Sequence, residues 1–140
     1  MLLHIIARGR IGRGPEAELV ERYLKRVTWP TRITELPDAG GKLPPKESAT
    51  RIVMLDETGD NLPSRVLAER LGAWRDGGIR EVRFLIGAAD GFDASDRAEA
   101  DLLLSFGRAT WPHLMARAML AEQLWRSVSI LANHPYHREG

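Results

Sequence analysis

Three short apolar runs constrain the fold of this chain more than any other feature. Residues 2–8, 51–56 and 81–86 are rich in Leu, Ile, Val, Met and Phe. Each run is too short for a helix and has the length of a strand that is buried in a sheet. Helical patterns separate the runs. This alternation predicts an α/β fold with a mostly parallel sheet.

The boundaries of the remaining elements follow from breakers and from apolar spacing. A helix is expected to begin at Pro15 and to end near residues 28–30, and the pair Gly77-Gly78 closes a helix over residues 64–76. Residues 32–36 and 102–105 form short strands, and residues 93–100 form a short helix. Prolines and glycines in residues 37–50 indicate an irregular connection.

The last helix, over residues 114–132, is apolar around most of its circumference. A solvated surface helix has a polar face of its own, so this helix must be covered on several sides. Burial against a second subunit explains the pattern, and so does a central position in the core of a monomer.

Length and composition limit the class of protein. A chain of 140 residues predicts a single domain over residues 1–140. Without cysteine there is neither a disulfide nor a thiolate zinc site, and the four histidines lack metal-ligand spacing, so we expect no metal. No basic leader and no membrane-spanning apolar run are visible, which predicts a cytoplasmic protein that contacts no membrane.

Charge is distributed unevenly although the net charge is only +1. Residues 1–33 carry seven Lys/Arg against three Asp/Glu, residues 34–107 carry nine against fourteen, and residues 108–140 carry four against two. If the two basic ends meet in space, they form a surface that suits RNA. Ordinary solvated charge is the alternative interpretation.

Three glycine-containing loops are expected at strand ends, over residues 56–59, 87–91 and 106–112. Ligands of open parallel sheets collect at the carboxyl ends of the strands, and Asp56 and Asp90 are the acids best placed there. No Walker loop, dinucleotide fingerprint or nucleophile elbow is present, which argues against ATP hydrolysis, NAD binding and serine hydrolase chemistry.

The C-terminal segment concentrates chemically active side chains. Two imidazoles, a phenol and a guanidinium occur in the string Asn133-His134-Pro135-Tyr136-His137-Arg138. These groups stack on bases, bind phosphate and transfer protons. A short solvated tail is the alternative.

Several segments together resemble one family. They are Phe84-Leu85-Ile86-Gly87-Ala88-Ala89-Asp90-Gly91, Thr110-Trp111-Pro112-His113, Arg117 with residues 121–126, and the C-terminal string. In this order they resemble the ribosomal RNA large subunit methyltransferase H family of the SPOUT class, over the whole chain. The terminal string is the most specific of these motifs.

The resemblance implies a fold, an activity and partners. The fold is a SPOUT-like α/β domain whose C-terminal part forms a deep trefoil knot, a rare exception to unthreaded chains. The protein is expected to work as a homodimer with S-adenosyl-L-methionine as cofactor. Its substrate is 23S rRNA within the assembled 70S ribosome, where it methylates N3 of pseudouridine 1915 in helix 69.

The resemblance also implies the site residues. The cofactor-binding positions are Leu55, Gly87, Phe106, Gly107, Arg108, Ala109, Thr110 and Trp111. His113 and Arg117 border the substrate. Tyr136, His137 and Arg138 match the catalytic tail, and Arg138 also contacts the substrate.

One departure from the family pattern leaves alternatives open. Ala88 stands where the family usually has a second glycine, and a Cβ at that position disfavours positive φ. Reduced cofactor affinity would leave a non-catalytic dimeric module that binds RNA or ribosomes. A third interpretation is a SPOUT methyltransferase that acts on another RNA.

Overall fold

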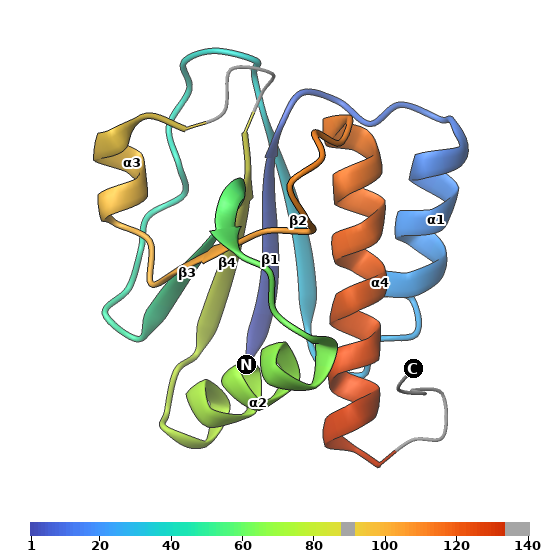
Figure 1. The fold of residues 1–140 in the computed structure, drawn as a ribbon, viewed down its shortest axis with the longest axis vertical. Helices are drawn as coiled ribbons and strands as arrows, with labels where there is room; N and C mark the ends of the chain where they lie inside the picture. The colour runs from blue at the N-terminus through green and yellow to red at the C-terminus, as the bar shows by residue number, and fades with distance from the viewer. Residues whose placement is uncertain (88–91, 134–140) are drawn as a thin grey trace.

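One parallel sheet of five strands organises the part of the chain that the structure describes (Figure 1). The computed structural model describes residues 1–87 and 92–133. The strands are β1 (Leu2–Arg8), β2 (Thr31–Leu36), β3 (Thr50–Asp60), β4 (Glu81–Ile86) and β5 (Leu102–Leu104). They lie in the order β2-β1-β4-β3-β5. The predicted α/β fold with a parallel sheet is confirmed.

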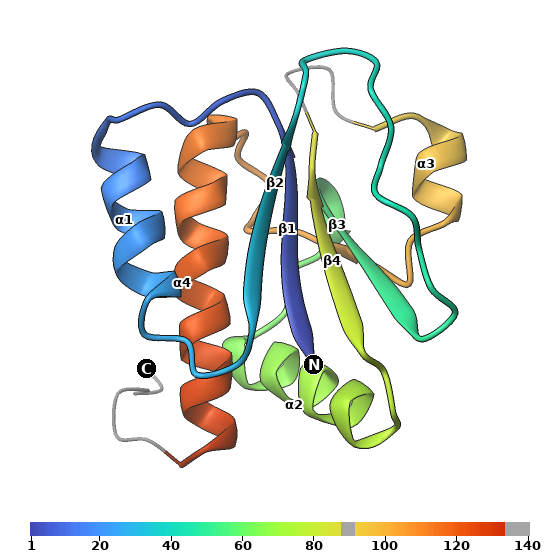
Figure 2. The same cartoon turned by 180° about the vertical axis from the view of Figure 1, so that it is seen from behind.

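The two faces of the sheet are covered differently (Figures 1 and 2). Three helices, α1 (Pro15–Leu24), α2 (Ser64–Asp76) and α4 (His113–Leu131), cover one face. The other face is covered by the short helix α3 (Ala94–Ala98) and by residues 37–49. Period-two alternation along the strands explains this division: Phe84 packs against the three helices, whereas Leu85 packs on the opposite side.

On the face of the sheet that α3 and residues 37–49 cover, the connection is held in place by an arginine. Arg83 is buried in β4 and donates hydrogen bonds to the carbonyl oxygens of Pro44 and Pro45 at 2.7 and 2.5 Å. Arg8 similarly donates to the carbonyl oxygens of Pro37 and Gly40. The proline-rich connection is therefore fastened across the sheet, although it has no regular secondary structure, as its sequence predicts.

Most predicted boundaries hold within one or two residues. The predicted end of α1 near residues 28–30 is wrong, because the helix ends at Leu24, and the main difference is in β3. Its expected end is Asp56, yet the strand continues to Asp60. Leu55 and Asp60 both pair with Leu104 of β5, so residues 56–59 bulge out of the strand. The expectation of a simple loop over residues 56–59 is therefore wrong, because a partner strand pairs on both sides of the excursion.

Glycine at position 59 is required by a close approach to β5. A Cβ there would lie 2.5 Å from the carbonyl oxygen of Leu103. No side chain tolerates such a contact with backbone, and only glycine lets the bulge lie against the neighbouring strand. The return of β3 to the sheet is completed by a hydrogen bond from the amide of Ser105 to the carbonyl oxygen of Asp60 at 2.9 Å.

One side of helix α4 is buried by other elements of the same chain. It packs against α1 and α2 and against the sheet, and its buried positions include Arg117, Leu120, Leu124 and Ser127. Packing inside the chain thus accounts for much of its apolar circumference, while Met115 near its start is 40% exposed. Burial against a second subunit stays a prediction.

Candidate functional site

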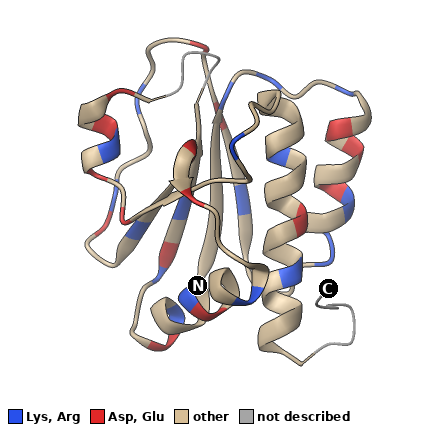
Figure 3. Ribbon diagram, in the orientation of Figure 1, with Lys and Arg blue, Asp and Glu red and all other residues tan. Residues whose placement is uncertain are grey.

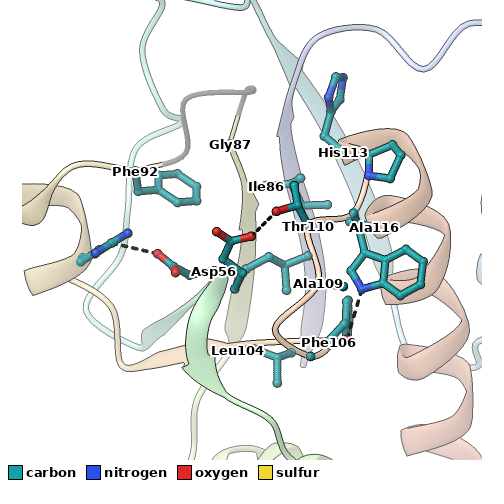
Figure 4. A pocket seen from close by; sticks show the side chains of 16 residues that line it. Asp56, Ile86, Gly87, Phe92, Leu104, Phe106, Ala109, Thr110, His113 and Ala116 are labelled. Atoms are coloured by element: carbon teal, nitrogen blue, oxygen red, sulfur yellow. Dashed lines mark hydrogen bonds and ion pairs between the residues drawn. The ribbon is translucent and has the colours of Figure 1, made fainter.

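An open pocket of about 570 Å³ lies at the carboxyl ends of β3, β4 and β5 (Figure 4). Parallel sheets bind ligands at this edge because the loops that follow the strands meet there. Three segments supply most of the lining: residues 55–57 of β3, residues 86–87 at the end of β4, and residues 106–113 between β5 and α4. Phe92 and Arg97 close the side next to α3.

Apolar side chains form much of the pocket wall. Ile86 and Leu104 are buried, and the rings of Phe92 and Phe106 approach from opposite sides (Figure 4). A pocket of this size, apolar with a few polar groups, is typical of sites for cofactors and other small molecules. The arrangement suits a flat aromatic ring with polar substituents.

The segment over residues 106–111 is fixed by its own hydrogen bonds. The amide of Gly107 donates to the hydroxyl of Ser105 at 3.0 Å, and Gly107 adopts a φ of 108°, which side-chain-bearing residues rarely take. The indole nitrogen of Trp111 donates to the carbonyl oxygen of Phe106 at 3.2 Å. These bonds fix the shape of this part of the wall.

Glu57 connects the β3 bulge to the same segment. Its carboxylate accepts a hydrogen bond from the hydroxyl of Thr110 at 2.8 Å, and the Ser105 hydroxyl lies 3.2 Å from its carbonyl oxygen. Two stretches of chain about fifty residues apart are thereby held together at the pocket mouth.

Asp56 is an ionised carboxylate, and both of its oxygens already have partners within the protein. One oxygen accepts from the amide and the hydroxyl of Thr58 at 2.8 and 2.7 Å, and the other lies 2.8 Å from Nε of Arg97. Burial by itself would raise the pKa of Asp56, but the Thr58 hydrogen bonds and the Arg97 guanidinium hold that pKa below its ordinary value. Asp56 thus closes one side of the pocket and is unsuited to accept a proton near neutral pH.

The structure brings together seven of the eight predicted cofactor residues. Leu55, Gly87, Phe106, Gly107, Ala109, Thr110 and Trp111 all line the pocket. Arg108 lies instead in a neighbouring hollow beside residues 57–59.

The two predicted substrate residues on α4 lie in different environments. His113 is exposed at the pocket rim, at the start of α4. Arg117, one turn later, is only 1% exposed and forms an ion pair with Glu35 of β2 at 2.5 Å. It also donates to the carbonyl oxygen of Gly9 at 3.1 Å. Arg117 therefore lies inside the protein, where it holds Glu35 of β2 and the backbone of Gly9 in place.

Glu35 is the acid that keeps Arg117 in place. Burial alone would raise the pKa of Glu35, but the hydrogen bond from Arg117, the amide of Ile11 and the charge of Arg117 together lower it. The carboxylate is thus ionised at neutral pH and pairs with the buried guanidinium.

Several residues of the sequence hypothesis lie outside the described part of the chain. They are Ala88 and Asp90 after β4, and Tyr136, His137 and Arg138 at the C-terminus. Their roles stay predictions. Conversely, the sequence did not single out Phe92 and Arg97, whose only signal is their position beside the expected strand-end loops, or Glu57, which lies within the expected loop over residues 56–59.

Two further findings concern the residues that the structure describes. Across residues 1–87 and 92–133, no helix combines the length and apolar character needed to cross a membrane. Within the same ranges, no group of three or more His, Asp or Glu side chains is arranged to bind a metal ion.

Comparison with known proteins identifies the class to which this fold and pocket belong. A family model described as predicted SPOUT methyltransferase matches residues 1–137. The match covers nearly the whole chain, including every strand and helix around the pocket. The chain belongs to the SPOUT methyltransferase family.

Full-length relatives give a more particular name. A protein of Rhizorhabdus wittichii is 74% identical over 140 residues, which cover all of both chains. One of Sphingopyxis alaskensis is 67% identical and one of Novosphingobium aromaticivorans 64%, each over at least 99% of both chains. All three bear the name Ribosomal RNA large subunit methyltransferase H, which confirms the resemblance drawn from the sequence motifs.

Proposed function

We propose that this chain transfers a methyl group from S-adenosylmethionine to N3 of pseudouridine 1915 in helix 69 of 23S rRNA. The observation that carries the proposal is the pocket, because seven of the eight residues that the family pattern assigns to the cofactor line it. The relatives named as rRNA large subunit methyltransferases support the substrate class, since they match this chain over its full length.

The pocket fits the proposed cofactor in size and chemistry. Leu55, Ile86 and Phe106 offer an apolar surface for an adenine ring, and the backbone of residues 106–111 offers hydrogen-bonding groups beside it. Asp56 is paired with Arg97, which leaves the Glu57 carboxylate at the same pocket to favour a ligand that carries positive charge. When bound, S-adenosylmethionine supplies an electrophilic methyl group on a sulfonium.

The acceptor nitrogen is an imide that carries a proton, so the enzyme must remove this proton as well as align the base. Asp56 is bound to Thr58 and Arg97, and its lowered pKa makes it a poor base. We therefore assign proton removal to the C-terminal tail. His137 accepts the proton directly or through water, Tyr136 orders or stacks on the base, and Arg138 binds a phosphate or an imide oxygen.

The remaining parts of the proposal concern assembly. The protein is proposed to act as a homodimer with a deep C-terminal knot, in the cytoplasm, on the assembled 70S ribosome. A small protein with a net charge of +1 has little electrostatic attraction for bulk RNA, and a folded ribosomal surface offers it additional contacts.

Transfer of labelled methyl groups to unmodified ribosomes tests the proposal. We expect label in 23S rRNA from intact ribosomes and much less from free 23S rRNA. Saturable S-adenosylmethionine binding, measured by calorimetry, separates this enzyme from a non-catalytic ribosome-binding module. Ribosome binding without cofactor binding would contradict the proposed activity.

A further inference from the structure

The loop between β1 and α1, residues 9–14, begins beside the pocket and carries two arginines. β1 pairs with β4, and Ala7 lies opposite Ile86, so the loop begins next to the pocket wall. It then passes over the N-terminal end of α4 (Figure 1). A Cβ on Gly9 would lie 4.0 Å from Nε2 of His113. The start of the loop therefore lies next to His113, which is at the pocket rim.

The backbone of this loop is fixed at two points by one ion pair. The guanidinium of Arg117 donates to the carbonyl oxygen of Gly9 at 3.1 Å, and the amide of Ile11 donates to Glu35 at 2.8 Å. Arg117 and Glu35 are themselves bonded at 2.5 Å. Arg10 stands between the two fixed residues, so its backbone position is set by Arg117 of α4 and Glu35 of β2.

The two arginines of the loop are available to a ligand. Arg10 and Arg13 are exposed, and neither forms an ion pair or a hydrogen bond with another described residue. Arg8, by contrast, is bonded to Pro37 and Gly40. Figure 3 shows the positive charges that follow the connection from β1 to α1.

The acids near this pair have other neighbours, although the charge of Arg10 contributes to the lowered pKa of Glu35. Glu35 is already bonded to Arg117. The Glu16 carboxylate lies over Gly14, where a Cβ would be 3.4 Å from it, and it faces the start of α1. Asp38 lies beside Gly9, on the side of the residues that follow β2. Because the Glu16 carboxylate places a negative charge at the start of α1, an anion at the loop is bound by the guanidinium groups and not by the end of that helix.

We propose that residues 9–14 dock the phosphate backbone of the RNA strand that presents its base to the pocket, with Arg10 and Arg13 as phosphate ligands and Arg117 and Glu35 as positioning residues. This inference rests on the proposed function. Guanidinium groups bind phosphate through paired hydrogen bonds, and such contacts set the register of a nucleic acid without reading its sequence. The loop thereby orients the substrate while the pocket performs the chemistry.

The test uses a double variant, R10A/R13A, and a control that removes the same charge. Arg32 and Arg80 are exposed at the amino-terminal end of the sheet, so R32A/R80A changes the net charge equally and leaves the pocket edge intact. Ribosome affinity is measured against salt concentration, together with KM for ribosomes, kcat and cofactor affinity.

We expect R10A/R13A to raise the ribosome KM about tenfold and to reduce the slope of log affinity against log salt by about 1.5, because two phosphate contacts are lost. Cofactor affinity stays unchanged, and R32A/R80A behaves as wild type. An unchanged KM and salt slope in R10A/R13A, or equal effects in both double variants, would overturn the docking proposal.

The positioning role is tested by R117K, which keeps the charge but not the paired geometry. We expect a raised ribosome KM with an unchanged cofactor affinity, and no further change of salt slope when R117K is added to R10A/R13A. Independent, additive effects on the slope would show that Arg117 acts on RNA binding separately from Arg10 and Arg13, and would overturn its positioning role. Thermal unfolding of each variant identifies loss of the fold.

The outcomes also distinguish failure of the loop proposal from failure of the proposed function. If the wild type binds ribosomes with a salt-dependent affinity but transfers no methyl group, the enzyme assignment fails and the salt slopes still decide the role of the loop. If the wild type does not bind ribosomes at all, both proposals are wrong.

Discussion

Replacing Gly59 by alanine disturbs the close contact between the β3 bulge and β5. The added Cβ would lie 2.5 Å from the Leu103 carbonyl oxygen and 2.6 Å from its carbon, whereas ordinary contacts begin at 3.4 Å. Both atoms are backbone, so β5 or the β3 bulge must move by nearly 1 Å. Overpacking of this kind costs about 1–3 kcal/mol. Loss of the hydrogen bond between Ser105 and Asp60 adds about 1 kcal/mol.

We therefore expect G59A to lower the free energy of unfolding by about 2–4 kcal/mol. Because the same bulge carries Glu57 to Thr110, cofactor affinity should fall as well. Urea unfolding followed by tryptophan fluorescence and calorimetry with S-adenosylmethionine measure the two effects.

Gly78 provides the matched control for G59A. It adopts a φ of 91° in the turn before β4, with open space around its Cβ position. G78A should cost about 1–2 kcal/mol from backbone strain alone and should leave cofactor affinity unchanged. If G59A unfolds within 1 kcal/mol of wild type and binds the cofactor equally well, the packing argument for the bulge is refuted.

Three further predictions address individual side chains, and one addresses the substrate. The pKa of Asp56 is depressed in the folded protein, so its ionised form stabilises the fold at pH values above its ordinary pKa of 3.8. This stabilisation is lost as the pH falls further. D56N should therefore lose less stability than wild type in urea titrations between pH 5 and pH 2.5. E35A leaves the buried Arg117 guanidinium without its counter-charge and should lower the free energy of unfolding by about 3 kcal/mol, while a change below 1 kcal/mol would show that water replaces the carboxylate. R138A should abolish most methyl transfer in a radiolabel assay but leave cofactor binding intact, and simultaneous loss of both would contradict the assigned division of roles. Intact ribosomes should be far better substrates than free 23S rRNA under matched conditions, and equal rates would exclude a requirement for the assembled particle.

The sequence predicts most of the fold because local signals are strong where the elements are regular. Residues 2–8, 64–76 and 81–86 have the observed boundaries of β1, α2 and β4, since apolar periodicity and a Gly-Gly stop are local properties. The end of β3 could not be predicted in this way. Its bulge depends on Leu104, which pairs with two residues of a strand far away in sequence.

The pocket shows the same division between local and distant information. The loop that begins at Phe106 could be placed there because parallel strands end at one edge of the sheet, whereas Leu55 was assigned through the family resemblance. The position of Arg117 could not, because the acid that binds it lies 82 residues earlier, on the edge strand β2. A basic residue near the start of a helix beside a pocket looks the same in sequence whether it is exposed or buried.

The most direct test of the central proposal is to map the nucleotide that receives the methyl group. Purified protein, labelled S-adenosylmethionine and ribosomes that lack the modification are incubated, and the labelled nucleotide in 23S rRNA is identified by mass spectrometry. The proposal predicts a single labelled position, N3 of pseudouridine 1915 in helix 69. Label at another nucleotide would contradict the proposed target, and no label despite cofactor binding would contradict the proposed activity on ribosomes.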